Sequence, residues 1–233
     1  INKRLSVANY RKSFVDMDKT DPLDAFIIAD FARCGRISSS PWRGAQFLAL
    51  QRLTRHRLHL VECITREKIY MVSNIYLKFS ELAVLDKGDK PFSNTYGATS
   101  AAVLTDFLSL DDITYAPVED LVAFVKEKGK NRFSDPHETA RILQKAARDS
   151  YRLDKVLYEP LNAAIASSFN VIRAMEVEVK AIDKAIEKTI KGLNTTEYLS
   201  LTSIPGIGPV LASGILAEIG TITSFGSNDA LAK

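Results

Sequence analysis

A long stretch that lacks helix-breaking residues is the feature that most constrains how this chain folds. Between Gly44 and Gly88 the sequence contains neither glycine nor proline. Just before it, Ser40-Pro41-Trp42 offers a helix start, because proline is well tolerated in the first turn. Apolar residues then recur on one broad arc at 3.6 residues per turn: Phe47, Leu50, Leu53, Leu60, Val61, Ile64, Val72, Ile75, Phe79 and Leu82. The pattern predicts a helix that continues to about Leu85, long enough to be typical of a coiled coil.

A second long pattern begins at Ile172 and repeats with heptad spacing. Its apolar members are Ile172, Met175, Val179, Ile182, Ile186 and Leu193, and Thr189 is its one polar member. Such a seam serves either as a dimerisation face or as an intramolecular pairing face. The alternative is an ordinary helix packed inside one bundle. Upstream, Asp135-Pro136 starts another helix, which we expect Pro160 to break or kink.

Shorter helices account for most of the remaining chain. Asp21-Pro22 starts a helix that Gly35 ends, and two more are predicted near Ala98–Leu108 and Val118–Lys128. Leu5-Ser6-Val7 is the one candidate strand end. Hydrophobic residues make up 46% of the sequence, which permits a sizeable core, and the 25% of charged residues argues against wholesale disorder. We therefore predict a mainly α fold class dominated by long coiled-coil helices.

Composition also limits the partners and the compartment. No apolar run approaches the roughly 20 residues that cross a bilayer, and no signal peptide opens the chain. Cys34 and Cys63 do not have the spacing of a metal-ligand pair, so we interpret them as reduced thiols rather than a disulfide. These features predict a cytoplasmic protein without a membrane partner.

Positive charge is concentrated in one part of the chain. The net charge is only +3, but residues 33–68 hold eight Lys or Arg and two Glu, a balance of 8 − 2 = +6. Such a segment can neutralise phosphates. On the long helix, the arc opposite the apolar one carries Arg52, Arg55, His56, His59 and Arg66. This arc is a candidate RNA or DNA surface, and the alternative is a solvated face. Arg57 falls on the apolar side, where it would snorkel or pair with an acid across the seam.

Two acids at a helix start form the first motif with chemical potential. In Lys19-Thr20-Asp21-Pro22-Leu23-Asp24-Ala25, the carboxylates of Asp21 and Asp24 are three residues apart and can share one side of the helix. Hard cations such as Mg²⁺ need carboxylate ligands of this kind. The alternative is helix capping, with Asp21 as the N-cap. A metal centre would also need acids from elsewhere.

A glycine-rich turn forms the second motif. Ile204-Pro205-Gly206-Ile207-Gly208-Pro209 is flanked by helical sequence and resembles the hairpin of a helix-hairpin-helix module. Gly206 and Gly208 would let the backbone approach a phosphate, and the amides of the next helix would face it. Contacts of this kind position a nucleic acid without reading its sequence. The alternative is a tight helix–helix turn without a ligand, which Pro209 favours because it removes one donor.

Together these motifs resemble the IS110 family of insertion-sequence transposases. The first is similar to the family's K-T/N-D-x-x-D-A signature, and the second, followed by Ala217-Glu218-Ile219-Gly220, is similar to the start of its C-terminal transposase domain. The resemblance implies three parts: the tail of a RuvC-like (RNase H-like) catalytic domain at 1–40, a helical coiled-coil region for oligomerisation at 41–195, and the start of a helix-hairpin-helix-containing transposase domain at 196–233.

The resemblance also implies a mechanism and a set of site residues. Asp21 and Asp24 match the last two acids of a D-E-D-D set and would be catalytic Mg²⁺ ligands. The family's serine nucleophile has no counterpart that we assign here, and the other two acids would lie upstream. Nucleic-acid contacts would come from Lys19, Arg52, Arg55, His59, Arg66, Gly206 and Gly208. The implied partners are the element's DNA ends, target DNA, a structured guide RNA, and further copies in a homodimer or homotetramer.

The ends of the sequence suggest an internal fragment. The chain begins at Ile1 and stops at Leu231-Ala232-Lys233, where the sequence indicates the start of a new helix. We expect these residues alone to be inactive. Two rivals to the transposase hypothesis are a non-catalytic nucleic-acid-binding scaffold and a RuvC-like Holliday-junction nuclease, which would share the acids but lack the nucleophilic serine.

Overall fold

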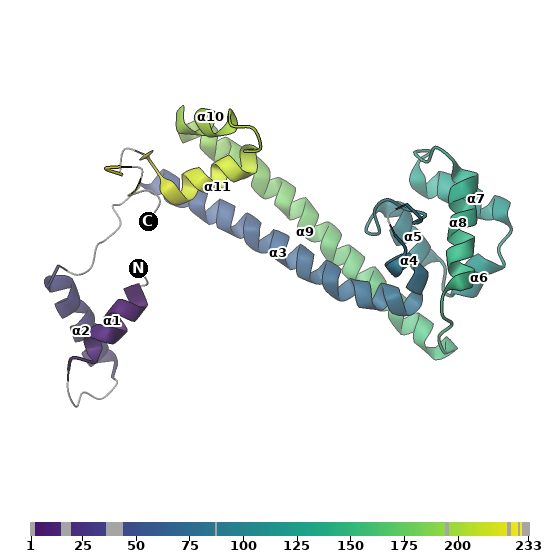
Figure 1. Cartoon of the computed structure of the whole chain (residues 1–233), viewed down its shortest axis with the longest axis horizontal. Coiled ribbons are helices and arrows are strands. Elements are labelled where there is room, and N and C mark those ends of the chain that lie inside the picture. The colour runs from purple at the N-terminus through teal and green to yellow at the C-terminus, as the bar shows by residue number, and fades with distance from the viewer. Residues whose placement is uncertain are drawn as a thin grey trace. The chain divides into compact units, whose positions relative to one another are not determined.

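In the computed structural model, every regular element of the described residues is a helix, which confirms the mainly α fold class (Figure 1). The structure describes residues 3–14, 20–35, 44–86, 88–193, 196–222, 225–227 and 229. The helices are α1 (Lys3–Arg11), α2 (Asp21–Arg33), α3 (Ala45–Lys78), α4 (Ser80–Val84), α5 (Ala98–Asp106), α6 (Leu110–Thr114), α7 (Val118–Gly129), α8 (Pro136–Asp149), the 3₁₀ turn η1 (Lys155–Leu157), α9 (Tyr158–Leu193), α10 (Thr196–Thr202) and α11 (Pro209–Ile219).

The chain divides into two compact units, one of residues 1–44 with 221–233 and the other of residues 45–220. In the first unit α1 packs against α2. The Tyr10 ring lies 5.0 Å from the Phe31 ring, and Ile27 and Phe31 are the buried residues of α2. The expected strand end at residues 5–7 is wrong, because these residues lie within α1.

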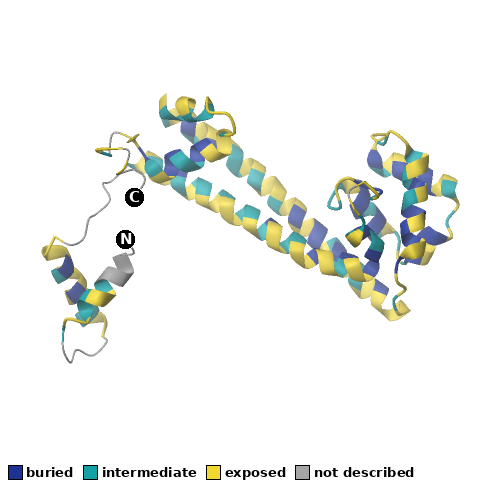
Figure 2. Cartoon of the chain, in the orientation of Figure 1, coloured by how far each residue is buried: buried dark blue, intermediate teal, exposed yellow. Residues whose placement is uncertain are grey.

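Two long antiparallel helices, α3 and α9, form the body of the second unit (Figure 1). Contacts between them run in opposite chain directions: Arg57 pairs with Asp183, Lys68 with Glu176, and Lys78 with Asn162. At 1.5 Å per residue, the 34 residues of α3 span about 51 Å. Figure 2 shows buried residues following the line where the two helices meet.

The heptad seam of α9 faces α3 of the same chain. Ile172 and Ile186 are buried, and the other apolar members are packed against the same two core clusters. The hydroxyl of Thr189 donates to the carbonyl of Ala185, 2.9 Å away, so the polar member of the seam is satisfied within its own helix. The seam is thus an intramolecular pairing face in this structure, and self-association through these helices stays a prediction.

The long helix ends earlier than its apolar pattern predicted. Phe79 has φ −146° and ψ 76°, so α3 stops at Lys78 and a separate short helix, α4, follows. Phe79 is buried, and so is the side chain of Lys78, which is only 2% exposed. The Lys78 ammonium donates to two carbonyls at the end of α5, those of Leu104 (2.7 Å) and Phe107 (2.6 Å). The end of α3 therefore coincides with tertiary contacts of Lys78 and Phe79. The periodicity of the apolar residues did not indicate where the helix ends.

Helices α4 to α8 pack around one end of the long pair (Figure 1). The helices expected near 98–108 and 118–128 are present as α5 and α7, whereas α6 was not predicted. Asp135 caps α8 by accepting from the Glu138 amide, 2.9 Å away. The expected break at Pro160 is wrong. The helix ends at Asp149 instead, and Pro160 sits in the first turn of α9, where a proline needs no amide donor.

At the other end of the pair, α10 and α11 cover the start of α3 and the end of α9 (Figure 1). Leu216 and Ala217 of α11 are buried in one cluster with Leu50, Ile186 and Ile190. This packing fixes the glycine turn before α11 relative to the basic arc of α3. No helix in the described part of the chain has both the length and the apolar character needed to span a membrane.

Candidate functional site

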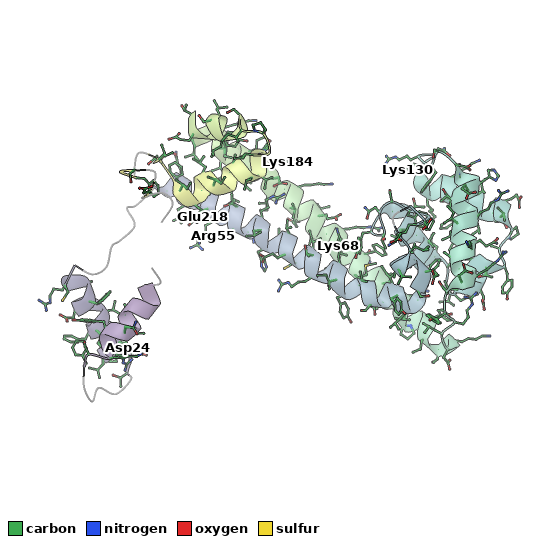
Figure 3. All side chains as sticks on the ribbon, viewed as in Figure 1. Asp24, Arg55, Lys68, Lys130, Lys184 and Glu218 are labelled. Carbon is green, nitrogen blue, oxygen red and sulfur yellow. The ribbon has the colours of Figure 1, made fainter. Side chains whose placement is uncertain are left out.

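The acid pair lies in the first turn of α2, labelled at Asp24 in Figure 3. Thr20 takes the N-cap position with extended backbone (φ −126°, ψ 150°), and the amide of Asp24 donates to its carbonyl at 2.9 Å. Asp21 is therefore the first helical residue rather than the N-cap, which removes the capping role considered for it. Acids in this turn favour the helix because they interact well with its dipole.

The two carboxylates have different surroundings. Asp21 is exposed, whereas Asp24 is half-buried and forms an ion pair with the Arg11 guanidinium of α1. Across the described residues, no group of three or more His, Cys, Asp or Glu side chains converges into a metal site. Lys19, which precedes the pair, lies outside the described residues. The pair can thus supply two carboxylates to a cation but cannot complete its coordination.

The third acid of α2, Asp30, fastens α1 and α2 together. It accepts a hydrogen bond from the Tyr10 hydroxyl at 2.7 Å and from the Arg33 guanidinium at 2.7 Å. The hydrogen bond to Asp30 raises the pKa of Tyr10 to about 12. The same contact, together with Arg33, lowers the pKa of Asp30. Asp30 therefore stays ionised as a structural anchor, and the Asp24–Arg11 ion pair makes a second link between α1 and α2, which leaves Asp21 as the exposed carboxylate of the first turn.

The basic arc is exposed along α3, but one of its members is already paired. The side chains of Arg52, Arg55, His59 and Arg66 are all exposed. The Arg55 guanidinium binds Glu218 of α11 through two bonds, Nε to Oε1 at 2.8 Å and Nη2 to Oε2 at 2.9 Å (Figure 3). This bidentate contact raises the pKa of Arg55. Arg55 thus joins α3 to α11 in addition to any role toward nucleic acid.

Arg57 does pair with an acid across the seam, as its place on the apolar side predicted. Its Nε lies 2.5 Å from Oδ1 of Asp183 on α9. Both side chains are partly shielded from solvent, at 22% and 38% exposed. The sequence indicated that an acid was needed here but not which one, because the register between α3 and α9 is a tertiary property. The Glu218 partner of Arg55 was not predicted, since nothing local links the two segments.

The glycine turn joins α10 to α11 as the hairpin motif predicted, and its two glycines differ. Gly206 has φ +92°, a conformation that favours glycine. Gly208 has φ −80° at the N-cap of α11, and a Cβ there would meet nothing within 4 Å. Pro209 follows in the first turn. The fold therefore requires a glycine at 206, while at 208 neither backbone angle nor space demands one.

A groove of about 740 Å³ lies between residues of α3 and α11. Its lining is mainly aliphatic, including Leu58, Val61, Leu211 and Ile215, and the Arg55–Glu218 pair borders it. Its polar side chains are Thr54, Arg55, Arg57 and Glu218, and the two arginines and Glu218 are engaged in ion pairs. The groove therefore adjoins the basic arc at Arg55, and Gly208 is also part of its lining.

Comparison with known proteins gives two family matches. Residues 1–77 match a family described as a transposase, the DEDD transposase domain of IS110 elements. Residues 199–233 match a family described as the IS116/IS110/IS902 transposase family. The first match contains the acid pair and the basic arc, and the second contains the glycine turn. No curated protein and no solved structure matches the chain. These two segments are therefore similar to transposases of the IS110 family, and the matches support a transposase or recombinase function.

Proposed function

We propose that this transposase cuts and rejoins DNA with the help of Mg²⁺ held in part by Asp21 and Asp24. The observation that carries the proposal is the position of both carboxylates in the first turn of α2, within the segment that matches the DEDD domain. Carboxylate oxygens are the ligands that this hard cation prefers. Asp21 is exposed and is not engaged as the helix cap, so it remains accessible to a cation.

The pairing of Asp24 with Arg11 is compatible with this role. A carboxylate has two oxygens, and the ion pair of Asp24 with the guanidinium is made through Oδ1. Mg²⁺ takes near-octahedral coordination and keeps several waters. Two protein carboxylates can therefore hold the ion while waters and substrate phosphates fill the other coordination positions. When bound, the cation would stabilise the charge that develops on the phosphate during cleavage. Within this chain, Arg11 would hold Asp24 in place, and Asp21 would supply the accessible oxygens.

We assign no serine of this chain as the nucleophile. The resemblance to the family implies that this serine, together with the first two acids of the D-E-D-D set, would lie outside these 233 residues. Covalent attachment of DNA to a serine conserves the energy of the phosphodiester bond, so rejoining would need no ATP. We propose accordingly that residues 1–233 alone do not catalyse strand transfer.

Nucleic-acid contacts would come from the basic arc and the glycine turn. Arg52, Arg66 and His59 are exposed along one helix; the two arginines would neutralise phosphates of the element ends, the target DNA or a structured guide RNA, and His59 would contact them. Gly208 would admit a phosphate close to the α11 amides, which would explain a glycine that the fold does not require. Lys19, Arg55 and Gly206 complete the proposed set, and the long helices would support a homodimer or homotetramer.

The acid pair can be tested in the complete transposase by a strand-transfer assay on DNA that carries the element ends. Asp21→Asn and Asp24→Asn keep the side-chain shape but remove the charge. Loss of a residue that only supports a metal ligand costs roughly 10- to 100-fold, so loss of a ligand should cost at least about a hundredfold. Asp135→Asn is the matched control, because Asp135 also precedes a proline at a helix start and asparagine caps equally well.

The outcomes separate this proposal from its rivals. Full activity in the Asp21→Asn/Asp24→Asn double variant would exclude the metal role. If the unaltered enzyme binds DNA but transfers no strand, the result would favour a non-catalytic scaffold. Junction cleavage that persists after every candidate serine of the complete enzyme is changed to alanine would favour a nuclease of the RuvC type.

A further inference from the structure

A histidine and a cysteine lie one turn apart on the outer face of α3. His59 is exposed and Cys63 is half-buried, and the spacing of four residues places them on the same side of the helix. Their reactive atoms, Nε2 of His59 and Sγ of Cys63, are 3.6 Å apart. The transposase matches and the proposed Mg²⁺ chemistry assign no role to this pair, and Cys63 is a free thiol.

The separation of these two atoms suits a tetrahedral metal ion. Zinc binds imidazole nitrogen at about 2.0–2.1 Å and thiolate sulfur at about 2.3 Å, so a tetrahedral ion holds the two ligand atoms about 3.6 Å apart. The observed separation of the two atoms therefore matches the separation expected when both bind the same ion. Nitrogen and sulfur ligands select zinc-like cations over the hard Mg²⁺ proposed for the carboxylates of α2.

The neighbouring side chains define what completes the site. Nη2 of Arg66 donates to Sγ of Cys63 at 3.3 Å, and contacts of this kind orient metal ligands. The ring of His56 stacks on that of His59, with centroids 6.2 Å apart and an interplanar angle of 27°. Two nearly parallel rings do not direct their nitrogens to one point, so His56 is not a third ligand. The remaining coordination positions would be filled by water or another exogenous ligand.

We propose that His59 and Cys63 form a two-ligand binding site for Zn²⁺ on the exposed face of α3. Binding would replace the thiol proton, which is released to solvent, and would join two successive turns of the helix through the metal. The site is separate from the acid pair of α2 in both residues and chemistry. It lies on the basic arc, so His59 can bind either the metal or a phosphate but not both at once.

The site can be tested on the 233-residue chain without nucleic acid. Co²⁺ is the probe, because a cysteine thiolate bound to Co²⁺ produces a charge-transfer absorbance in the near ultraviolet. We expect this band to appear on titration of the reduced protein and to disappear when Zn²⁺ is added. Cys63→Ser should abolish the band, and His59→Gln should raise the dissociation constant by at least about tenfold.

Matched controls exist for both ligands. Cys34→Ser removes the other thiol and His56→Gln removes the adjacent imidazole, and neither should change the titration. Cys63→His should lose the absorbance band but retain Zn²⁺ binding measured by calorimetry, since histidine is also a zinc ligand. Circular dichroism would verify that each variant remains helical. No band at any Co²⁺ concentration, or a band that survives Cys63→Ser and vanishes with Cys34→Ser, would overturn the proposal.

Discussion

The buried Lys78 ammonium makes the stability of this protein depend on pH in a direction that can be calculated. Its Nζ donates to the carbonyls of Leu104 and Phe107, and to the side-chain carbonyl of Asn162 on α9. Burial lowers the pKa of Lys78 from 10.5 to about 8, and the negative charge of Asp112 opposes part of this shift. We predict the effect of Lys78→Met on the free energy of unfolding between pH 7 and pH 10.5.

Two contributions set the size of the effect. At pH 7 the variant leaves the two backbone carbonyls without their donor, at roughly 1–3 kcal/mol for each buried acceptor, and it also relieves the cost of burying a charge. We therefore expect a modest loss of stability at this pH. Between pH 8 and 10.5 the folded protein releases the Lys78 proton while the unfolded chain keeps it, so the stability of the unaltered protein rises with pH. A difference of 2.5 between the two pKa values corresponds to about 3 kcal/mol.

The measurement is urea unfolding of both proteins, followed by circular dichroism at several pH values in this range. Other lysines and tyrosines titrate in both proteins, so the difference between the two unfolding free energies isolates Lys78. The gap in favour of the unaltered protein should widen by about 3 kcal/mol from pH 7 to 10.5. A gap that stays constant over this range would show that burial does not depress this pKa, and the reasoning from the buried ammonium would be refuted.

Two further predictions concern the second unit. Substituting Arg57 and Asp183 by alanine, singly and together, should give a coupling free energy of up to about 1 kcal/mol in a double-mutant cycle, because the ion pair is only partly shielded from solvent. A coupling free energy indistinguishable from zero in low salt would contradict the pairing. Gly206→Ala should destabilise by roughly 1–2 kcal/mol because alanine is strained at φ +92°, whereas Gly208→Ala should change stability by less than about 0.5 kcal/mol. Thermal unfolding of both glycine variants checks this, and equal losses would show that the turn is held differently.

The candidate residues divide by the range of the interactions that define them. The helix start and the three-residue spacing of Asp21 and Asp24 are local features, but they fit capping as well as metal binding, and the resemblance to the IS110 family is what favoured metal binding. The four-residue spacing of His59 and Cys63 is also a local feature, whereas the spacing of Cys34 and Cys63 does not indicate a metal-ligand pair. The engagement of Arg55 by Glu218 could not be anticipated, because the two residues are 163 positions apart in the chain.

The sequence by itself determined the helical character of the chain, several helix starts, and the arcs along which apolar and basic residues lie. Backbone hydrogen bonding and 3.6-residue periodicity act over a few residues, so they can be read without knowing the rest of the fold. Only the tertiary structure decided that the α9 seam pairs with α3, that α3 stops where Lys78 enters the core, and which acid meets Arg57. A periodic pattern identifies a face to be buried, but the free energy of burial is similar for many apolar partners, so the partner and its register depend on the whole chain.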